Sequence, residues 1–305
     1  MATPSTPGNA PGVLQWFPLF TVVIWAGNTL VTKLSAGLIA PGSMTFYRWF
    51  LAFVLLLPFT AAGLWRERAL VRQHWPKLAA LGILGMVIYQ GLAYYAAPNT
   101  SATNMGILIA LTPLCSALLS NVLTGERLTW GALLGGVVSL AGVLWLIARG
   151  SLANLAHLHL GSGDALMLAA VLANSLYAVL LQRWHLPLSS WAQLTVQVGC
   201  ALVFLLPWYL GSERSPITAA NGPLVLYAGV LASVLAPYLW ISGVQAVGPS
   251  RASVFTNLIP LLVAIAAVVW LGEQLALYHA VGGALALAGV WLGQAVRRPV
   301  LKAAH

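Results

Sequence analysis

Two basic residues, Lys33 and Arg48, lie inside apolar stretches of the sequence. A Lys or Arg at the centre of a lipid bilayer costs at least about 2.5–3.5 kcal/mol, so an ionisable residue at that depth is a candidate functional group. Lys33 or Arg48 could attract the carboxylate of a substrate. The alternative is that both side chains extend to the outer interface or bond to carbonyl groups at helix ends.

Amide side chains form a second set of candidates. Thr21, Trp25, Asn28 and Thr32 follow one another at spacings of four, three and four residues, which places them on one helix face. Hydrogen bonding between helices, common for such side chains in membranes, is the alternative role. The candidates for binding the polar part of a substrate are Trp25, Asn28, Asn104, Asn174 and Asn257.

Several aromatic residues lie away from the ends of the apolar stretches. Most Trp and Tyr residues of membrane proteins form belts at the two interfaces. A ring at greater depth could instead stack on an apolar or aromatic substrate. The aromatic candidates are Tyr89, Tyr94, Tyr177, Tyr238 and Trp240.

Three prolines, Pro113, Pro237 and Pro260, lie inside apolar stretches. Each removes a backbone donor and clashes with the carbonyl group four residues earlier, so each should bend its helix. The freed carbonyls could accept from a substrate ammonium group where they face a cavity. We predict that these positions act as hinges.

The elements that carry these residues are membrane-spanning helices. The chain has 305 residues, of which 60% are hydrophobic and 6% charged, whereas soluble domains carry about 25% charged residues. A crossing helix needs roughly 20 apolar residues, and the continuous apolar runs exclude the alternation of a membrane β-barrel. Ten helices are predicted: Phe17–Ser35, Gly42–Ala62, Lys77–Ala97, Ser101–Leu123, Leu128–Ala148, Gly163–Trp184, Ser189–Leu210, Gly222–Val244, Ser250–Leu271 and Ala276–Val296.

The second half of the sequence repeats the first at an offset of 147 residues. An apolar run with an internal proline, a Gly-Glu corner and a Gly-Gly pair occur in both halves without a gap, which indicates an internal repeat. Each Gly-Glu carboxylate is predicted to stabilise the N-terminus of the helix that follows it. The matched residues include Leu111, Pro113, Glu126, Gly135 and Gly136 in the first copy, and Leu258, Pro260, Glu273, Gly282 and Gly283 in the second.

Because each half holds five helices, the second half enters the membrane from the opposite face. The predicted fold is therefore an all-α integral membrane protein built from two inverted-topology five-helix repeats, an arrangement typical of secondary transporters. We expect a disordered cytoplasmic tail at 1–16, a first repeat at 17–150 and a second at 162–297. The Gly-Gly pairs allow close helix contact, either with each other or with a second copy, so the chain is expected to be a monomer or a homodimer.

The distribution of charge predicts the orientation. The net charge is +9, and most basic residues flank apolar runs on the side that holds both termini. This pattern predicts cytoplasmic termini in a bacterial-type inner membrane and contact with anionic lipid rather than nucleic acid. The partners expected are thus a small-molecule substrate and membrane lipid.

The sequence shows no pattern of an enzyme. It lacks paired carboxylates, a nucleophile motif and a convincing metal-ligand cluster, so no catalytic residue, metal or cofactor is expected. No nucleotide-binding loop is present to use ATP. The absence of an acidic residue at mid-membrane depth, where proton-coupled transporters often carry one, favours facilitated diffusion or exchange.

These features resemble the drug/metabolite transporter superfamily, in its ten-helix EamA-type branch, and within it most of all the aromatic amino acid exporters. The resemblance implies a central cavity between the halves and export of amino acids, aromatic or otherwise apolar, and related metabolites by alternating access. An exporter of cationic drugs or other metabolites, or a membrane-embedded enzyme, is the alternative. The motifs that carry the resemblance are Trp25-Ala26-Gly27-Asn28 with Lys33, the arginine Arg48, and Gly125-Glu126-Arg127-Leu128-Thr129 with the Gly-Gly pairs.

Overall fold

The computed structural model describes residues 13–124, 130–151, 153, 161–247, 255–256 and 258–295, and this part of the chain contains helices and no strands. Within the predicted tail, Leu14–Trp16 forms a 3-10 turn, η1, that leads into α1. The helices that follow are α1 (Phe17–Ser35), α2 (Pro41–Gly82), η2 (Ile83–Ile88), α3 (Tyr89–Ala96), η3 (Ala97–Asn99), α4 (Ala102–Ile109), α5 (Thr112–Thr124), α6 (Trp130–Ile147), α8 (Ser162–Trp184), α9 (Ser190–Gly211), α10 (Gly222–Leu226), η4 (Tyr227–Leu235), α11 (Ala236–Val247), α13 (Ile259–Leu271) and α14 (Leu277–Ala295).

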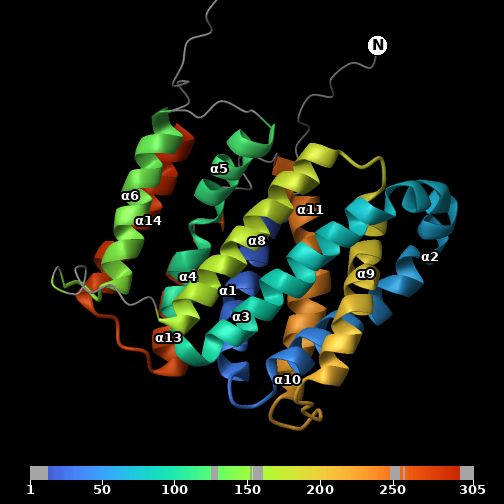
Figure 1. Cartoon of the computed structure of the whole chain (residues 1–305), viewed down its shortest axis with the longest axis horizontal. Helices are drawn as coiled ribbons and strands as arrows, with labels where there is room; N and C mark the ends of the chain where they lie inside the picture. The colour runs from blue at the N-terminus through green and yellow to red at the C-terminus, as the bar shows by residue number, and fades with distance from the viewer. Residues whose placement is uncertain are drawn as a thin grey trace, which may run out of the picture.

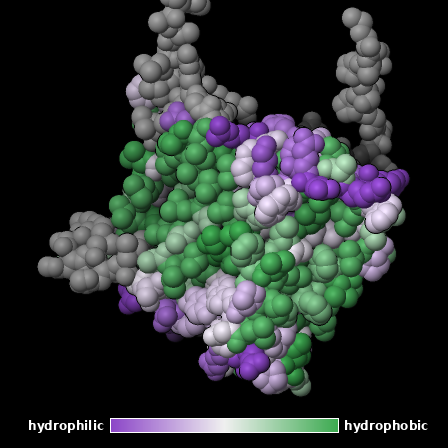
Figure 2. Space-filling view, turned by 45° about the vertical axis from the view of Figure 1, so that its right-hand side comes forward, coloured by the Kyte–Doolittle hydropathy of each residue, from purple (hydrophilic) through white to green (hydrophobic). Residues whose placement is uncertain are grey.

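The helices form one bundle of membrane-spanning length (Figure 1). Among the described residues, six helical stretches are long and apolar enough to cross a membrane, and three further apolar helices are shorter. One of the six, Pro41–Asn99, has 59 residues, enough for two crossings. The predicted all-α integral membrane fold is thereby confirmed. Figure 2 shows a broad hydrophobic band between two hydrophilic ends, as expected of a surface that meets lipid.

The second and third predicted helices are not separated by a loop, contrary to the sequence-based expectation. α2 runs on through the basic segment between them, and Figure 1 shows the helical path turning back on itself at one end of the bundle. The indole N–H of Trp49 donates to the carbonyl oxygen of Met86 at 3.1 Å. A straight helix would separate these residues by about 55 Å. The two arms of the path therefore lie side by side.

The fourth predicted helix is broken into α4 and α5 next to Pro113. The break lies at Ala110 and Leu111, where the missing N–H of the proline ends the α-helical ladder. The hydroxyl of Thr112 donates to the carbonyl oxygen of Ile109 at 2.7 Å, which satisfies the carbonyl that Pro113 leaves free. In the second repeat Leu258, the copy of Leu111, is also a turn residue, and α13 begins at Ile259.

Two π-helical segments occupy matching places in the two repeats, a feature that the sequence did not predict. η2 ends at Ile88 and η4 ends at Leu235, and these residues are 147 positions apart. Pro237 lies two residues after the end of η4, in the first turn of α11. π-Helical turns are rare and occur frequently at functional sites.

α6 and α14, the last helices of the two repeats, pack against each other in antiparallel orientation. A Cβ atom at Gly135 would lie 2.2 Å from the carbonyl oxygen of Gly289, and one at Gly142 would lie 2.6 Å from that of Gly282. The hydroxyl of Ser139 donates to the carbonyl oxygen of Ala286 at 3.2 Å across the same contact. The glycines thus bring the two helices of one chain together, which was one of the two predicted arrangements.

Candidate substrate-binding site

Arg48 lies at the centre of a polar cluster buried in the bundle, with only 3% of its surface exposed. Its Nε donates to Ser233 Oγ at 2.8 Å. Its Nη1 donates to Asn28 Oδ1 at 3.1 Å, Gln90 Oε1 at 3.0 Å and Tyr94 Oη at 3.2 Å. α1, α2, α3 and η4 each contribute to this cluster, so both repeats build it.

The guanidinium of Arg48 keeps unused hydrogen-bonding capacity. Arginine has five N–H donors; Nε supplies one of them and Nη1 two. The three acceptors at Nη1 already exceed its two hydrogens. Among the described residues, Nη2 has no hydrogen-bond acceptor, so its two N–H groups are unused.

The charge of Arg48 has no carboxylate partner among the described residues. The chain contains only five acidic residues, and all of them lie at the ends of the predicted helices or in the links between them. A buried charge without a counter-charge is strongly unfavourable. An anionic group beside Arg48 would therefore be stabilised.

Ser233 orients the guanidinium through the local geometry of η4. Its hydroxyl donates to the carbonyl oxygen of Ala228 at 2.8 Å, five residues earlier in the chain. Because a serine hydroxyl has one hydrogen, this bond leaves the oxygen free only to accept, and it accepts from Arg48 Nε. The π-helical segment thus fixes one side of the guanidinium.

Aromatic rings flank the cluster. Tyr89, on α3, lies close enough to Arg48 and Tyr94 to interact electrostatically with both. Trp25, one helical turn before Asn28 on α1, packs against Trp240 with ring centroids 5.4 Å apart. These aromatic rings and the unused Nη2 of Arg48 could bind a molecule that has an apolar ring and an anionic group.

The remaining predicted site residues lie elsewhere. The hydroxyl of Tyr177 donates to Gln197 Oε1 at 3.2 Å, and Asn174 is half-buried on α8. Tyr238 is 46% exposed and stacks on Trp191. Asn257 lies outside the described residues. The structure thus brings Asn28, Tyr89 and Tyr94 together around Arg48, and Trp25 with Trp240.

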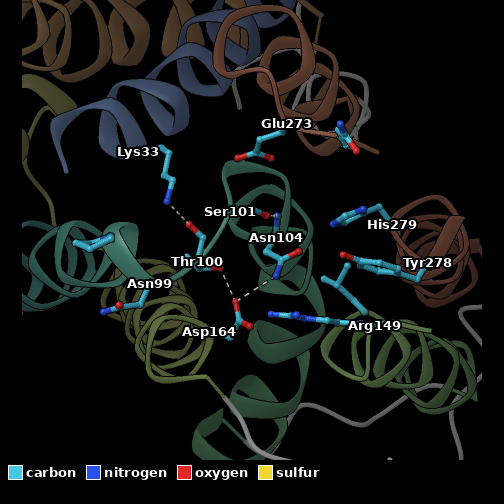
Figure 3. Close-up of a pocket in the computed structure, with 13 residues that line it drawn as sticks. Lys33, Asn99, Thr100, Ser101, Asn104, Arg149, Asp164, Glu273, Tyr278 and His279 are labelled. Carbon is cyan, nitrogen blue, oxygen red and sulfur yellow. Dashed lines mark hydrogen bonds between the residues drawn. The ribbon is translucent and has the colours of Figure 1, made fainter. Parts of the chain in front are cut away.

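Lys33 binds carbonyl groups at a helix end, the alternative role considered for it. Its Nζ donates to the carbonyl oxygens of Ala97 and Thr100 at 2.7 and 2.6 Å. Asp164 accepts from Thr100 Oγ1 at 2.5 Å and from Asn104 Nδ2 at 3.4 Å (Figure 3). These contacts lie at the end of the bundle away from the N-terminus.

The sequence predicted that Glu273 stabilises the helix that follows it. The hydrogen bonds of its carboxylate instead go to a helix of the other repeat. Its Oε1 accepts from the backbone N–H of Ala102 at 2.7 Å. Its Oε2 accepts from the N–H and hydroxyl of Thr103 at 3.2 and 2.7 Å. Glu273 therefore caps α4 and joins the two repeats. Its counterpart Glu126 lies outside the described residues.

Sequence reasoning missed Gln90 and Ser233, but it named Arg48 as a residue that could attract the carboxylate of a substrate. Gln90 follows Tyr89 directly, and Ser233 is a single polar residue in the apolar run of η4. The repeat offers no clue, because the counterparts of Arg48 and Ser233 are Thr195 and Met86. The signal that could have found the cluster is the pairing of a buried arginine with neutral acceptors on neighbouring helices.

Comparison with known proteins identifies the family. The profile of the EamA-like transporter family matches the chain twice, at residues 14–148 and 161–293. The chain belongs to the EamA-like transporter family. It is thus a multi-pass membrane transporter.

Other EamA-like transporters resemble the chain along most of its length. The "Uncharacterized transporter YyaM" of Bacillus subtilis is 25% identical over 90% of this chain and 92% of its own. The "Probable terminal-alkyne amino-acid exporter" of Streptantibioticus cattleyicolor is 28% identical over 91% and 92%. A solved crystal structure, 23% identical, superposes with a TM-score of 0.61 and covers 93% of this chain and 96% of its own, a likeness that concerns the fold alone.

Proposed function

We propose that this transporter exports amino acids with aromatic or other apolar side chains by alternating access between its two repeats. The observation that carries the proposal is the buried guanidinium of Arg48, whose described partners are all neutral. An α-carboxylate that accepts from Nη2 would supply the missing negative charge. Charge-assisted hydrogen bonds of this kind are roughly twice as strong as neutral ones.

The surroundings of Arg48 favour an amino acid over a cationic drug. A cation placed beside the unneutralised guanidinium would be repelled, whereas a carboxylate would be attracted. Tyr89 and the pair of Trp25 and Trp240 offer ring surface for the substrate side chain. The relative from Streptantibioticus cattleyicolor, by its name an amino-acid exporter, supports this substrate class.

Matched breaks in the two repeats support alternating access. The helix interruptions near Pro113 and Pro260 and the π-helical segments η2 and η4 occur at corresponding places in the two halves. Two halves of like fold and opposite orientation can exchange conformations, which would open the site to either side in turn. The basic residues near both termini favour cytoplasmic ends in a bacterial-type inner membrane.

Efflux from proteoliposomes tests the proposal. Vesicles that contain the wild-type protein and are loaded with radiolabelled L-phenylalanine should release the label faster than equally loaded vesicles without protein. Arg48→Gln should abolish this protein-dependent efflux, because the amide carries no charge to bind the carboxylate. The matched control Arg66→Gln alters an exposed arginine in the helical bend and should retain the wild-type rate.

Competition distinguishes recognition of the carboxylate from recognition of the ring. 3-Phenylpropionate, which keeps the carboxylate, should slow efflux of the label, whereas phenethylamine, which lacks it, should not. Competition by phenethylamine alone, or efflux of cationic dyes but of no amino acid, would overturn the proposal. Equal efflux by Arg48→Gln and wild type would remove Arg48 from the site.

A further inference from the structure

A cavity of about 570 Å³ lies at the outer end of the bundle, apart from the Arg48 cluster. This outer vestibule opens between the ends of α4, α6, α8 and α14, and its walls carry Asn104, Arg149, Asp164, Tyr278 and His279 (Figure 3). Pockets that bind small molecules commonly measure about 300–1,000 Å³. The vestibule therefore has room for an amino acid.

The vestibule carries a basic group that no described residue engages. The guanidinium of Arg149 and the hydroxyl of Tyr278 have no hydrogen-bond partner among the described residues, and the Tyr278 hydroxyl points towards Asn104 (Figure 3). His279 uses Nδ1 to accept from the N–H of Ala276 at 3.1 Å, so its Nε2 is left to face the space. The vestibule thus contains three groups that can donate hydrogen bonds and that no described residue accepts from.

The backbone at Arg149 is held in a conformation that L-residues disfavour. Its φ is +52°, and that of Gly150 is +74°. A left-handed residue after a helix is usually glycine, and the conformation is unfavourable for other residues. The turn is closed by the N–H of Gly150, which donates to the carbonyl oxygen of Trp145 at 3.0 Å. It places the arginine side chain beside Asp164 in the vestibule (Figure 3).

The vestibule also carries acceptors, which lie next to these donors (Figure 3). Asn104 donates through Nδ2 to Asp164, which fixes the orientation of the amide, and its Oδ1 is buried without a partner. A buried acceptor without a donor is unfavourable. Asp164 accepts only from neutral donors among the described residues, so its negative charge is also not neutralised by a hydrogen-bonded cation. These acceptors would be stabilised by a positively charged donor.

We propose that the outer vestibule is a second substrate site, which binds the zwitterionic head group of an amino acid. The carboxylate accepts from Arg149 and the Tyr278 hydroxyl, and the ammonium group donates to Asn104 Oδ1 and Asp164. Unused donors and unused acceptors lie next to each other in this one cavity, which matches a ligand that carries two opposite charges. The proposal rests on the proposed function and adds a site where an exported amino acid binds before it is released.

Binding stoichiometry tests the second site. Equilibrium dialysis of radiolabelled L-phenylalanine against purified detergent-solubilised protein should give two bound molecules per wild-type chain. Arg149→Gln should remove one of them, and Arg48→Gln should remove the other. Tyr278→Phe deletes one hydroxyl and should weaken vestibule binding about tenfold, and it serves as a second variant if Arg149→Gln does not fold. Arg214→Gln, an exposed arginine outside the vestibule, is the matched control and should bind two molecules.

The outcomes separate this proposal from the proposed function. A single wild-type site that Arg48→Gln removes and Arg149→Gln leaves intact would overturn the vestibule site and leave the amino acid transporter standing. The absence of any L-phenylalanine binding would overturn both. In Arg48→Gln protein, neither phenethylamine nor 3-phenylpropionate should displace the label, because each lacks one charge. Equal displacement by either one would show that the vestibule is not a zwitterion site.

Discussion

At the scale of single residues, the feature that defines this transporter is an arginine with an incomplete set of partners. The neutral acceptors around Arg48 hold the guanidinium in place without cancelling its charge. Such a group is costly in the empty protein and is stabilised when a carboxylate arrives. Under the proposed function, part of the binding free energy of the substrate would come from neutralising this charge.

Ser233→Ala should weaken substrate binding although the serine need not touch the substrate. Without the hydroxyl, Arg48 Nε loses its acceptor and the guanidinium gains freedom to rotate away from the pose that presents Nη2. Hydrogen bonds to charged groups contribute about 1.5–3 kcal/mol, and we expect about three- to tenfold weaker binding in equilibrium dialysis because the other partners remain. Ser190→Ala, at the exposed start of α9, is the control; an unchanged affinity for Ser233→Ala would contradict the positioning role.

At the scale of elements, three charged residues converge on the corner between α3 and α4. Lys33 donates to carbonyl oxygens in the segment that directly follows α3. Glu273 accepts from N–H groups at the start of α4. Each charge opposes the partial charge of the helix end that it meets. Asp164 adds a bond to the hydroxyl of Thr100 between them. Because Asp164 and Glu273 belong to the second repeat, the corner is also a contact between the two halves.

Glu273→Gln should loosen this corner. The amide keeps the shape of the side chain but loses the charge that strengthens its bonds to the N–H groups of Ala102 and Thr103. Loss of a helix cap costs about 0.5–2 kcal/mol, so amide exchange there should rise by about two- to thirtyfold in hydrogen-exchange mass spectrometry. Peptides from α9 supply an internal control. Unchanged exchange at the start of α4 would mean that the carboxylate is not what holds it.

The sequence predicted the bundle and its repeat but not the contacts that join the parts. Apolar run length and the matched prolines depend on local chemistry, so the membrane-spanning helices and the break next to Pro113 could be foreseen. Glu273 was assigned to its neighbouring helix, because nothing in the sequence indicates that α4 lies within reach. The reversal of the chain between the second and third predicted helices was expected, whereas the helical form of the link between them was missed.

The site shows the same limit. Asn28 and Tyr94 could be predicted as polar or aromatic residues in apolar surroundings, whereas Ser233 gains its role only because η4 places it beside Arg48. The repeat itself was misleading here, since the residues that make the cluster polar are not matched between the two halves. The internal repeat predicts the arrangement of the helices, whereas the Arg48 cluster is made of residues that differ between the two repeats.

At the scale of the whole molecule, the contact between α6 and α14 ties the end of one repeat to the end of the other. Its backbones approach so closely that a side chain at Gly135 or Gly142 would meet a carbonyl oxygen. Close approach of this kind is how small residues support helix association in lipid. The pair lies to one side of the helices that surround Arg48 (Figure 1), so it joins the repeats without entering the site.

Gly135→Leu should lower the thermal stability of the protein. A Cβ atom there would lie 2.2 Å from the carbonyl oxygen of Gly289, so α6 and α14 would have to separate. Overpacking of this type costs about 1–3 kcal/mol, and the melting temperature in detergent should fall. Gly63→Leu is the matched control, because a Cβ atom at Gly63 meets nothing within 4 Å. Equal melting temperatures for the two variants would contradict the close contact.

The buried position of Arg48 also decides how the protein experiences the membrane voltage. Moving one elementary charge through the full potential is worth about 2.3 kcal/mol per 100 mV. The guanidinium stays with the protein, and a zwitterion that binds to it brings no net charge across. In the proposed function, a zwitterion carried without a coupled ion moves no net charge, so its export would be electrically silent and independent of the membrane potential.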